Sequence, residues 1–237
     1  MKYYKYKKIN DLTLSSINES YIWFSSIGAL NDPFEGDFTF NDNVWRKTTP
    51  LIKDGTDSIF NQASKLFEMY RFTLNNALYV FSLSSNKSNV VMSSHYGDEH
   101  RGIIIEYDFP DDIGELSDDE VVLLGKDRYI REVEYVDKTI LSEDFLNDGE
   151  KISNCILRKQ KDWKYEGEFR MVIYNTAIRK LGFKLKLKRS FITNISFGIN
   201  VSETLQNDTI NKIIIPGIGF SRQYKLNGHY STIHTPC

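Results

Sequence analysis

One short segment constrains the fold of this chain more than any other: two glutamates and an arginine stand directly before an apolar run. Trp163–Arg170 leads into Met171–Tyr174. If the segment is extended, Glu166, Glu168 and Arg170 face the same side, because side chains alternate along a strand. Two carboxylates and a guanidinium on one face either form a salt-bridge ladder or line a site. The sequence leaves both interpretations open.

A second polar cluster also precedes an apolar strand. Ser93–Gly102 is rich in polar and charged residues and leads directly into Ile103–Ile105. The desolvation free energy of polar groups at the start of apolar strands is lowest where water or a ligand reaches these groups. We therefore expect Tyr4–Tyr6, His95–Tyr96 and Glu166–Arg170 to converge within one cleft.

Composition narrows the class of protein. The chain has 237 residues, of which 41% are hydrophobic, and a net charge of -2. This size predicts one domain over residues 1–237, and the charge provides no global basic field for nucleic acid. The two cysteines form no disulfide framework or zinc motif, so no metal is expected. Because residues 1–8 are polar and no run of about 18 apolar residues occurs, we expect a cytoplasmic protein without membrane contact.

Local patterns predict short strands mixed with helices. A cap-like Asn10 begins an expected helix over 10–17, and alternating apolar and lysine residues predict an edge strand over 183–188. Further helices are expected at about 51–76 and over 143–161, with a helical turn from Val90. The other expected strands cover 21–24, 76–84, 102–107, 130–135, 192–198 and 212–215. We expect strands from the end of the sequence to join a sheet that strands near the N-terminus begin. This arrangement predicts an α+β fold, with mixed or antiparallel sheets and flanking helices.

Four motifs occur in an order that resembles a known family. They are Tyr4-Lys5-Tyr6; Asn31-Asp32-Pro33-Phe34-Glu35; Met92-x-Ser94-His95-Tyr96-Gly97 with Arg101-Gly102; and Lys159-x3-Trp163-x-Tyr165-Glu166-x-Glu168-x-Arg170. This set resembles the bacterial family known as domain of unknown function 2971, from about Tyr3 to Ile215. The family usually has tryptophan where this chain has Ser93. The resemblance implies candidate site residues but no reaction.

The layout is also similar to the ADP-ribosyltransferase superfamily, which includes toxins. There an early-strand residue, a central Ser or Tyr and a late glutamate, often in an E-x-E pair, hold NAD in a cleft. A carboxylate can stabilise the oxocarbenium character that develops when the nicotinamide bond breaks. The resemblance implies an NAD-utilising transferase, as in a bacterial toxin or phage-defence effector.

The resemblance implies roles for particular residues. The catalytic candidates are Glu168, Glu166, His95 and Tyr96. The candidates for binding NAD are Tyr4, Lys5, Tyr6, Ser84, Arg101, Arg170 and Trp163. The candidates for binding the substrate are Asn31, Asp32 and Glu35, although Asn31–Phe34 is also a typical turn sequence. The expected partners are a nucleotide-type small molecule and a protein or nucleic-acid acceptor.

Two other function classes remain open. A metal-dependent nuclease would place Asp32, Glu35, Glu166 and Glu168 around Mg²⁺ and would lose activity with EDTA. A non-catalytic module would bind a ligand such as a nucleotide through His95 and Arg101 without turnover. An NAD-cleaving enzyme would instead need Glu168 and no metal.

Overall fold

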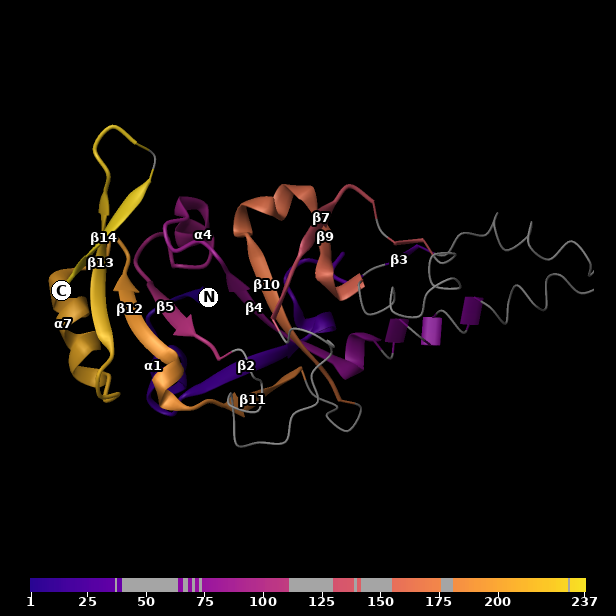
Figure 1. Ribbon diagram of the computed structural model, residues 1–237. Helices are drawn as coiled ribbons and strands as arrows, with labels where there is room; N and C mark the ends of the chain where they lie inside the picture. Colours follow the sequence, from indigo (N-terminus) through magenta and orange to yellow (C-terminus); the bar gives the residue numbers. More distant parts are fainter. Residues whose placement is uncertain are drawn as a thin grey trace, which may run out of the picture.

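A computed structural model describes residues 1–36, 38–39, 64–65, 68–69, 71–72, 74–110, 130–138, 140–141, 155–175, 181–229 and 231–237. Helices flank a mostly antiparallel sheet, which gives the α+β class that the sequence predicts (Figure 1). The strands are β1 (Lys2–Lys7), β2 (Tyr21–Ser26), β3 (Phe38–Thr39), β4 (Leu78–Ser84), β5 (Ile103–Asp108), β6 (Ile130–Glu132), β7 (Glu134–Val136), β8 (Ile140–Leu141), β9 (Arg158–Gln160), β10 (Glu168–Tyr174), β11 (Gly182–Lys186), β12 (Ile192–Phe197), β13 (Gly219–Lys225) and β14 (Thr232–Pro236). The α-helices are α1 (Asp11–Asn18), α4 (Val90–His95) and α7 (Glu203–Lys212), and the 3₁₀ turns are η1 (Ile27–Ala29), η3 (Cys155–Leu157), η4 (Lys161–Glu166) and η5 (Arg189–Phe191). Among the described residues, no helix is long and apolar enough to cross a lipid bilayer.

The main sheet divides at β4. Its strands run in the order β11-β2-β4-β1-β5-β12-β13-β14, and β10 pairs with β4 and β6 outside this path. On one side, β4 pairs with β10 along its whole length. On the other side it pairs with β2 at Tyr79 and Val80 and with β1 only at Ser84. Residues 81–83 therefore lie at a fork where β1 and β2 separate.

Apolar residues cover the two faces of the sheet unequally. The larger core includes Tyr3, Phe24, Phe81, Ile105 and Met171. A smaller core on the other face contains residues such as Val80, Val172 and Ile156. Because strand neighbours alternate, Glu168 and Arg170 share the face of Val172. The charged residues of β10 therefore lie next to the smaller core.

Several predicted elements are confirmed. Asn10 caps α1, its side-chain oxygen accepting from the Thr13 amide at 2.9 Å. The strands expected over 21–24, 76–84, 102–107 and 192–198 correspond to β2, β4, β5 and β12. The lysine-alternating strand is β11, which ends the order of the main sheet, as predicted.

Other predictions are wrong. The helix expected over 143–161 is, in its described part, the turn η3 followed by strand β9. The strand expected over 130–135 breaks at Val133, whose amide donates to the Glu168 carbonyl at 2.9 Å, so that β6 pairs with β10 and β7 with β9. Residue 212 ends α7, and 213–215 form no strand. Most of the helix expected at 51–76 falls outside the described residues.

The turn between α4 and β5 has unusual backbone geometry. Asp98, Glu99 and His100 have φ values of 51°, 54° and 67°. Each non-glycine residue in this left-handed region costs about 1 kcal/mol or more. Hydrogen bonds hold the turn, including those from Glu99 N to Ser94 O (3.1 Å) and from Gly102 N to Gly97 O (2.7 Å). The turn therefore fixes α4 against the start of β5.

We expect Gly102→Ala to destabilise the fold by about 2 kcal/mol or more, because overpacking forces backbone shifts. An added Cβ would lie 2.2 Å from the Lys7 carbonyl oxygen and 2.8 Å from that of Gly97. Gly28→Ala is the control, since its Cβ would meet no atom closer than 3.7 Å. Urea unfolding measures the difference, and equal stability of the two variants would contradict the prediction.

Candidate functional site

A fully buried guanidinium organises the polar cluster. Arg170, 1% exposed, donates through Nε to Glu168 Oε1 at 2.7 Å and through Nη2 to Glu168 Oε2 at 2.9 Å. Nη2 also donates to Glu35 Oε1 at 2.8 Å, and Nη1 donates to the Ile156 carbonyl at 2.6 Å. Arg170 thus joins β10, the loop before Gly36 and η3.

Lys159 is the second cation of the cluster. Its Nζ lies 2.7 Å from Glu166 Oε2, 3.3 Å from Glu168 Oε2 and 3.1 Å from Glu35 Oε1. The ring centroid of Trp163 lies 4.7 Å from the same nitrogen. Three buried carboxylates therefore surround two buried cations, an arrangement in which no charge is left without an opposite partner.

Glu166 connects this cluster to α4. The Tyr96 hydroxyl donates to Glu166 Oε1 at 2.7 Å, and the Asn31 amide donates to that hydroxyl at 3.4 Å. Glu166 lies in η4 rather than in the strand, so the expected three-residue alternation holds only for Glu168 and Arg170. Gly167 lies between them with φ of 50° and turns the chain into β10.

Backbone contacts fix the Glu166 turn. The Ser84 hydroxyl donates to the Glu166 carbonyl at 2.6 Å, and Ser85 N donates to the Gly167 carbonyl at 3.0 Å. The Tyr135 hydroxyl accepts from the Glu168 amide at 2.8 Å. Ser84, a candidate for binding NAD, thus makes a structural hydrogen bond that positions Glu166.

The residues of α4 are tied to the same turn. Asn89 caps α4, its side-chain oxygen accepting from the Met92 amide at 3.1 Å, and its side-chain nitrogen donates to the Tyr165 carbonyl. His95 Nδ1 lies 3.2 Å from the Tyr165 hydroxyl. These contacts place His95 and Tyr96 beside η4.

A small cavity of about 140 Å³ opens beside the cluster. The expected cleft residues among its lining residues are Tyr4, Lys5, Tyr6, Asn31, Glu35, Ser84, Tyr96, Glu166 and Glu168. Lys159 also lines it, although it was not among the candidate site residues. Its place in the motif Lys159-x3-Trp163 was the available sequence signal.

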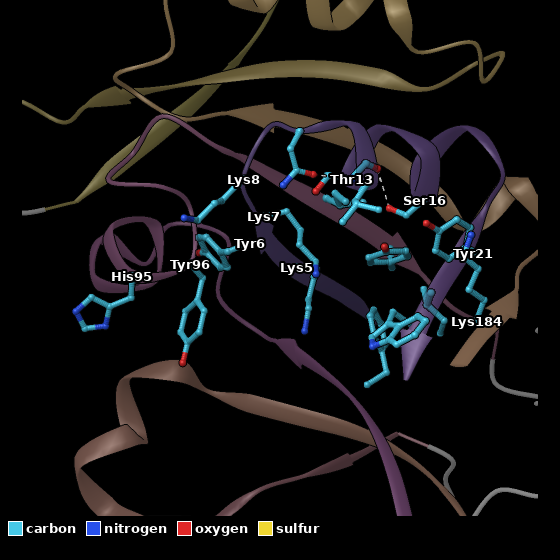
Figure 2. Close-up of a pocket in the computed structure, with 17 residues that line it drawn as sticks. Lys5, Tyr6, Lys7, Lys8, Thr13, Ser16, Tyr21, His95, Tyr96 and Lys184 are labelled. Atoms are coloured by element: carbon cyan, nitrogen blue, oxygen red, sulfur yellow. Dashed lines mark hydrogen bonds between the residues drawn. The ribbon is translucent and has the colours of Figure 1, made fainter. Parts of the chain in front are cut away.

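A larger cavity of about 640 Å³ adjoins the first, because Lys5, Tyr6 and Tyr96 line both. Figure 2 shows His95 and Tyr96 on one side of it, Lys184 on the other and Lys5 between them. Its walls contain four lysines, Lys5, Lys7, Lys8 and Lys184. Of these, only Lys5 was expected at the site.

The remaining candidates lie elsewhere or make other contacts. Arg101 lines neither cavity and pairs with Glu99 at 2.9 Å on the surface. Asp32 forms a turn, its side chain accepting from the Phe34 amide at 3.0 Å. Trp163 contacts Lys159 behind the small cavity, and Arg170 lies in the ion-pair cluster.

Burial and ion pairing shift the pKa values of the cluster in opposite directions. Burial alone would raise the pKa of Glu168, but Arg170 and Lys159 lower it to about 2. Burial raises the pKa of Glu35 despite the same two cations. Burial also raises the pKa of the Tyr96 hydroxyl, as does its hydrogen bond to Glu166. Glu168 is therefore a carboxylate at neutral pH, and Tyr96 is a hydrogen-bond donor.

The carboxylates already have cationic partners. In the part of the chain that the structure describes, no group of three or more His, Cys, Asp or Glu side chains is arranged to hold a metal ion. Lys159 and Arg170 lie among Glu35, Glu166 and Glu168, where a cation would have to bind. The two side-chain cations therefore take the place that a metal ion would need between these three carboxylates.

Comparison with known proteins gives one match. Residues 92–171 match the family model described as "Protein of unknown function (DUF2971)". The resemblance to this family is confirmed over that segment. The segment contains His95, Tyr96, Lys159, Glu166 and Glu168, and thus most of the charged cluster. No curated protein and no solved structure matches the chain.

Arg170→Met should destabilise the protein by about 3–5 kcal/mol, because removing one partner leaves buried carboxylates without compensation. The control is Arg101→Met, which removes an exposed pair worth at most about 1 kcal/mol. Urea unfolding at neutral pH compares the two. A loss below about 1 kcal/mol for Arg170→Met would contradict a central role for the guanidinium.

Stability should fall as pH decreases from about 4.5 towards 2, by an amount on the order of 2–3 kcal/mol for Glu168. A carboxylate whose pKa is lowered by folding stabilises the protein above its unfolded value, and this contribution is lost as the folded pKa is approached. Glu168→Gln should flatten this part of the profile, whereas the exposed control Glu134→Gln should not. Unfolding free energies at a series of pH values test this, and parallel profiles for wild type and Glu168→Gln would contradict it.

Proposed function

We propose that the protein binds a nucleotide of the NAD type across the two adjoining cavities and breaks its nicotinamide–ribose bond. The observation that carries the proposal is the paired carboxylate cluster, fixed on β10 and η4, at the wall of a cavity. A fixed, ionised carboxylate stabilises positive charge on a ribose without reorganisation during the reaction. The two carboxylates differ in their hydrogen-bond partners, since Glu168 accepts from Arg170, whereas Glu166 accepts from Tyr96.

The contacts favour Glu166 as the carboxylate that meets the ribose. Its Oε1 is bound by Tyr96, a residue that lines both cavities, so a ribose hydroxyl can replace or join the tyrosine hydroxyl. Both oxygens of Glu168 are bound by Arg170. Glu168 is therefore the positioning residue, the reverse of the order expected from the E-x-E resemblance.

The chemistry follows from this placement. The bond between the ribose anomeric carbon and the nicotinamide nitrogen breaks, and its electron pair leaves with nicotinamide. The carbon then bonds to a nucleophilic oxygen or nitrogen of water or of an acceptor, whose proton passes to Glu166. Between these two events the ribose carries positive charge, which the negative charge of Glu166 stabilises. The acceptor determines whether the result is NAD hydrolysis or ADP-ribosyl transfer, the activity expected of a toxin or phage-defence effector.

Glu166→Gln should reduce nicotinamide release from NAD by about 10²-fold or more, because it removes one preorganised charge. The amide oxygen can still accept from Lys159, and the NH₂ group can donate to the Tyr96 hydroxyl, so the fold should persist. Glu134→Gln, at the exposed first position of β7, is the matched control and should retain activity. Release is measured by chromatography, with and without cell extract as a source of acceptor.

Three results would contradict the proposal or part of it. Absence of nicotinamide release from the wild type under both conditions would exclude NAD cleavage. Metal-dependent cleavage of nucleic acid that EDTA abolishes would favour the nuclease instead. Wild-type activity in Glu166→Gln would reject the assigned carboxylate.

A further inference from the structure

The larger cavity has a wall of one charge sign. Lys5, Lys7, Lys8 and Lys184 line its volume of about 640 Å³, and its described lining includes no aspartate or glutamate. Figure 2 shows Lys5 and Lys7 projecting into it from β1. A concave surface lined by one sign of charge concentrates ligands of the opposite charge.

The four lysines differ in their partners. Lys8 pairs with Asp98 at 3.5 Å, and Lys184 lies 3.9 Å from Glu19, both with exposed side chains. Among the described residues, no carboxylate lies within 4.0 Å of the amine of Lys5 or Lys7. The two inner lysines therefore lack the counter-ions that the outer two have.

The fork in the sheet explains the position of Lys5. Because β1 and β2 separate beside residues 81–83, the Ser82 carbonyl is free of a strand partner on that side. Lys5 Nζ donates to this oxygen at 2.5 Å and lies 5.0 Å from the Phe81 ring centroid. Both partners are neutral, so the Lys5 ammonium has no direct ion pair with a described carboxylate.

The protonation of these lysines agrees with this geometry. Burial, assisted by the charge of Lys7, lowers the pKa of Lys5 to about 7, against the opposing effect of Glu168 and Glu166. Burial also lowers the pKa of Lys7. An anion in the cavity would stabilise both ammonium forms and supply the missing counter-charge.

Aromatic side chains form much of the remaining wall. Tyr21 and Trp23 of β2, Phe81 of β4 and Tyr107 of β5 also line the cavity. Planar bases stack on such rings, and each stacked base contributes about 1–3 kcal/mol of binding free energy in nucleic-acid complexes. Phosphate-binding lysines next to aromatic rings match a ligand that carries both phosphate and base.

We propose that the larger cavity binds the phosphate groups of a nucleotide through Lys5 and Lys7, with the base against the aromatic wall near Trp23. The inference rests on the proposed function in one respect, since the same ligand would extend to Glu166. Phosphate binding is nevertheless measurable without turnover.

Isothermal titration calorimetry with ADP-ribose tests the site, because this probe has the phosphates and base of NAD but no nicotinamide to lose. Wild type should bind ADP-ribose at least tenfold more tightly than adenosine. Lys7→Met should weaken ADP-ribose binding about tenfold or more, as expected when a charged contact to phosphate is removed. Lys186→Met, an exposed lysine on β11 outside the cavity, is the matched control and should bind like wild type.

Stability separates a binding role from a structural one. Without ligand, Lys7→Met should unfold at the same urea concentration as wild type or a higher one, because a half-buried ammonium without a carboxylate partner does not stabilise the fold. Weak binding by a less stable Lys7→Met would indicate a structural role and overturn the assignment.

The pH dependence gives an independent readout. Affinity should fall as pH rises above about 7, because binding requires the ammonium form of Lys5. The charged groups that act on Lys5 are Lys7 of β1, Lys159 of β9, Glu166 of η4 and Glu168 of β10. The cavity walls also contain the titratable side chains of His95, Tyr6, Tyr21, Tyr96 and Tyr107. Lys5→Met should flatten this dependence, whereas His95→Gln should keep it; the opposite pattern would overturn the role of Lys5.

The two proposals fail separately. Lysine-dependent ADP-ribose binding without nicotinamide release would support the phosphate site and reject NAD cleavage. Nicotinamide release with ADP-ribose binding that Lys7→Met leaves unchanged would reject the phosphate site alone. Equal affinity for adenosine and ADP-ribose, or no binding of either, would also reject it.

Discussion

The buried guanidinium of Arg170 is the interaction on which the site depends. A charge that cannot reach water needs both an opposite charge and hydrogen-bond acceptors for its N–H groups. Arg170 obtains them from Glu168 of its own strand, from the Ile156 carbonyl and from Glu35, which is 135 residues away in the sequence. Ile156 belongs to the smaller apolar core, so the polar cluster lies directly against that core.

Carboxylates held in this way differ in their freedom to meet a ligand. Glu168 and Glu35 are bound by Arg170, whereas Glu166 depends on Lys159 and the Tyr96 hydroxyl. The strained turn at 98–100 and the Asn89 cap hold α4 against this arrangement. Backbone strain near Tyr96 is thus balanced by hydrogen bonds that fix the contact between Tyr96 and Glu166.

The division of the sheet at β4 has a similar consequence. It leaves a carbonyl without a strand partner and brings a lysine to it, between two cavities. Continuous pairing of β1 with β4 would have closed this space. The same irregularity therefore produces the cavity and places a lysine without a direct ion pair in its wall.

The sequence by itself determined features that depend on neighbours along the chain. The Asn10 cap, the common face of Glu168 and Arg170, and the lysine-protected edge strand follow from spacings of two or three residues. These periodicities also predicted the α+β class. Family motifs predicted that His95, Tyr96 and Glu166 lie close together, but not their contacts.

Tertiary structure alone decided how distant residues meet. Lys159 lies on β9 rather than on the expected helix, because pairing with β7 outweighs local propensity in a short segment. Helix α7 forms from Asn, Asp and Thr, which favour helices weakly, with a Ser202 cap and packing of Ile210 against the core. The cationic cavity requires β1, β2 and α1 to surround a fork in the sheet, and strand pairing over such distances leaves no local pattern. The sequence therefore identified the charged residues, while packing determined which of them have partners.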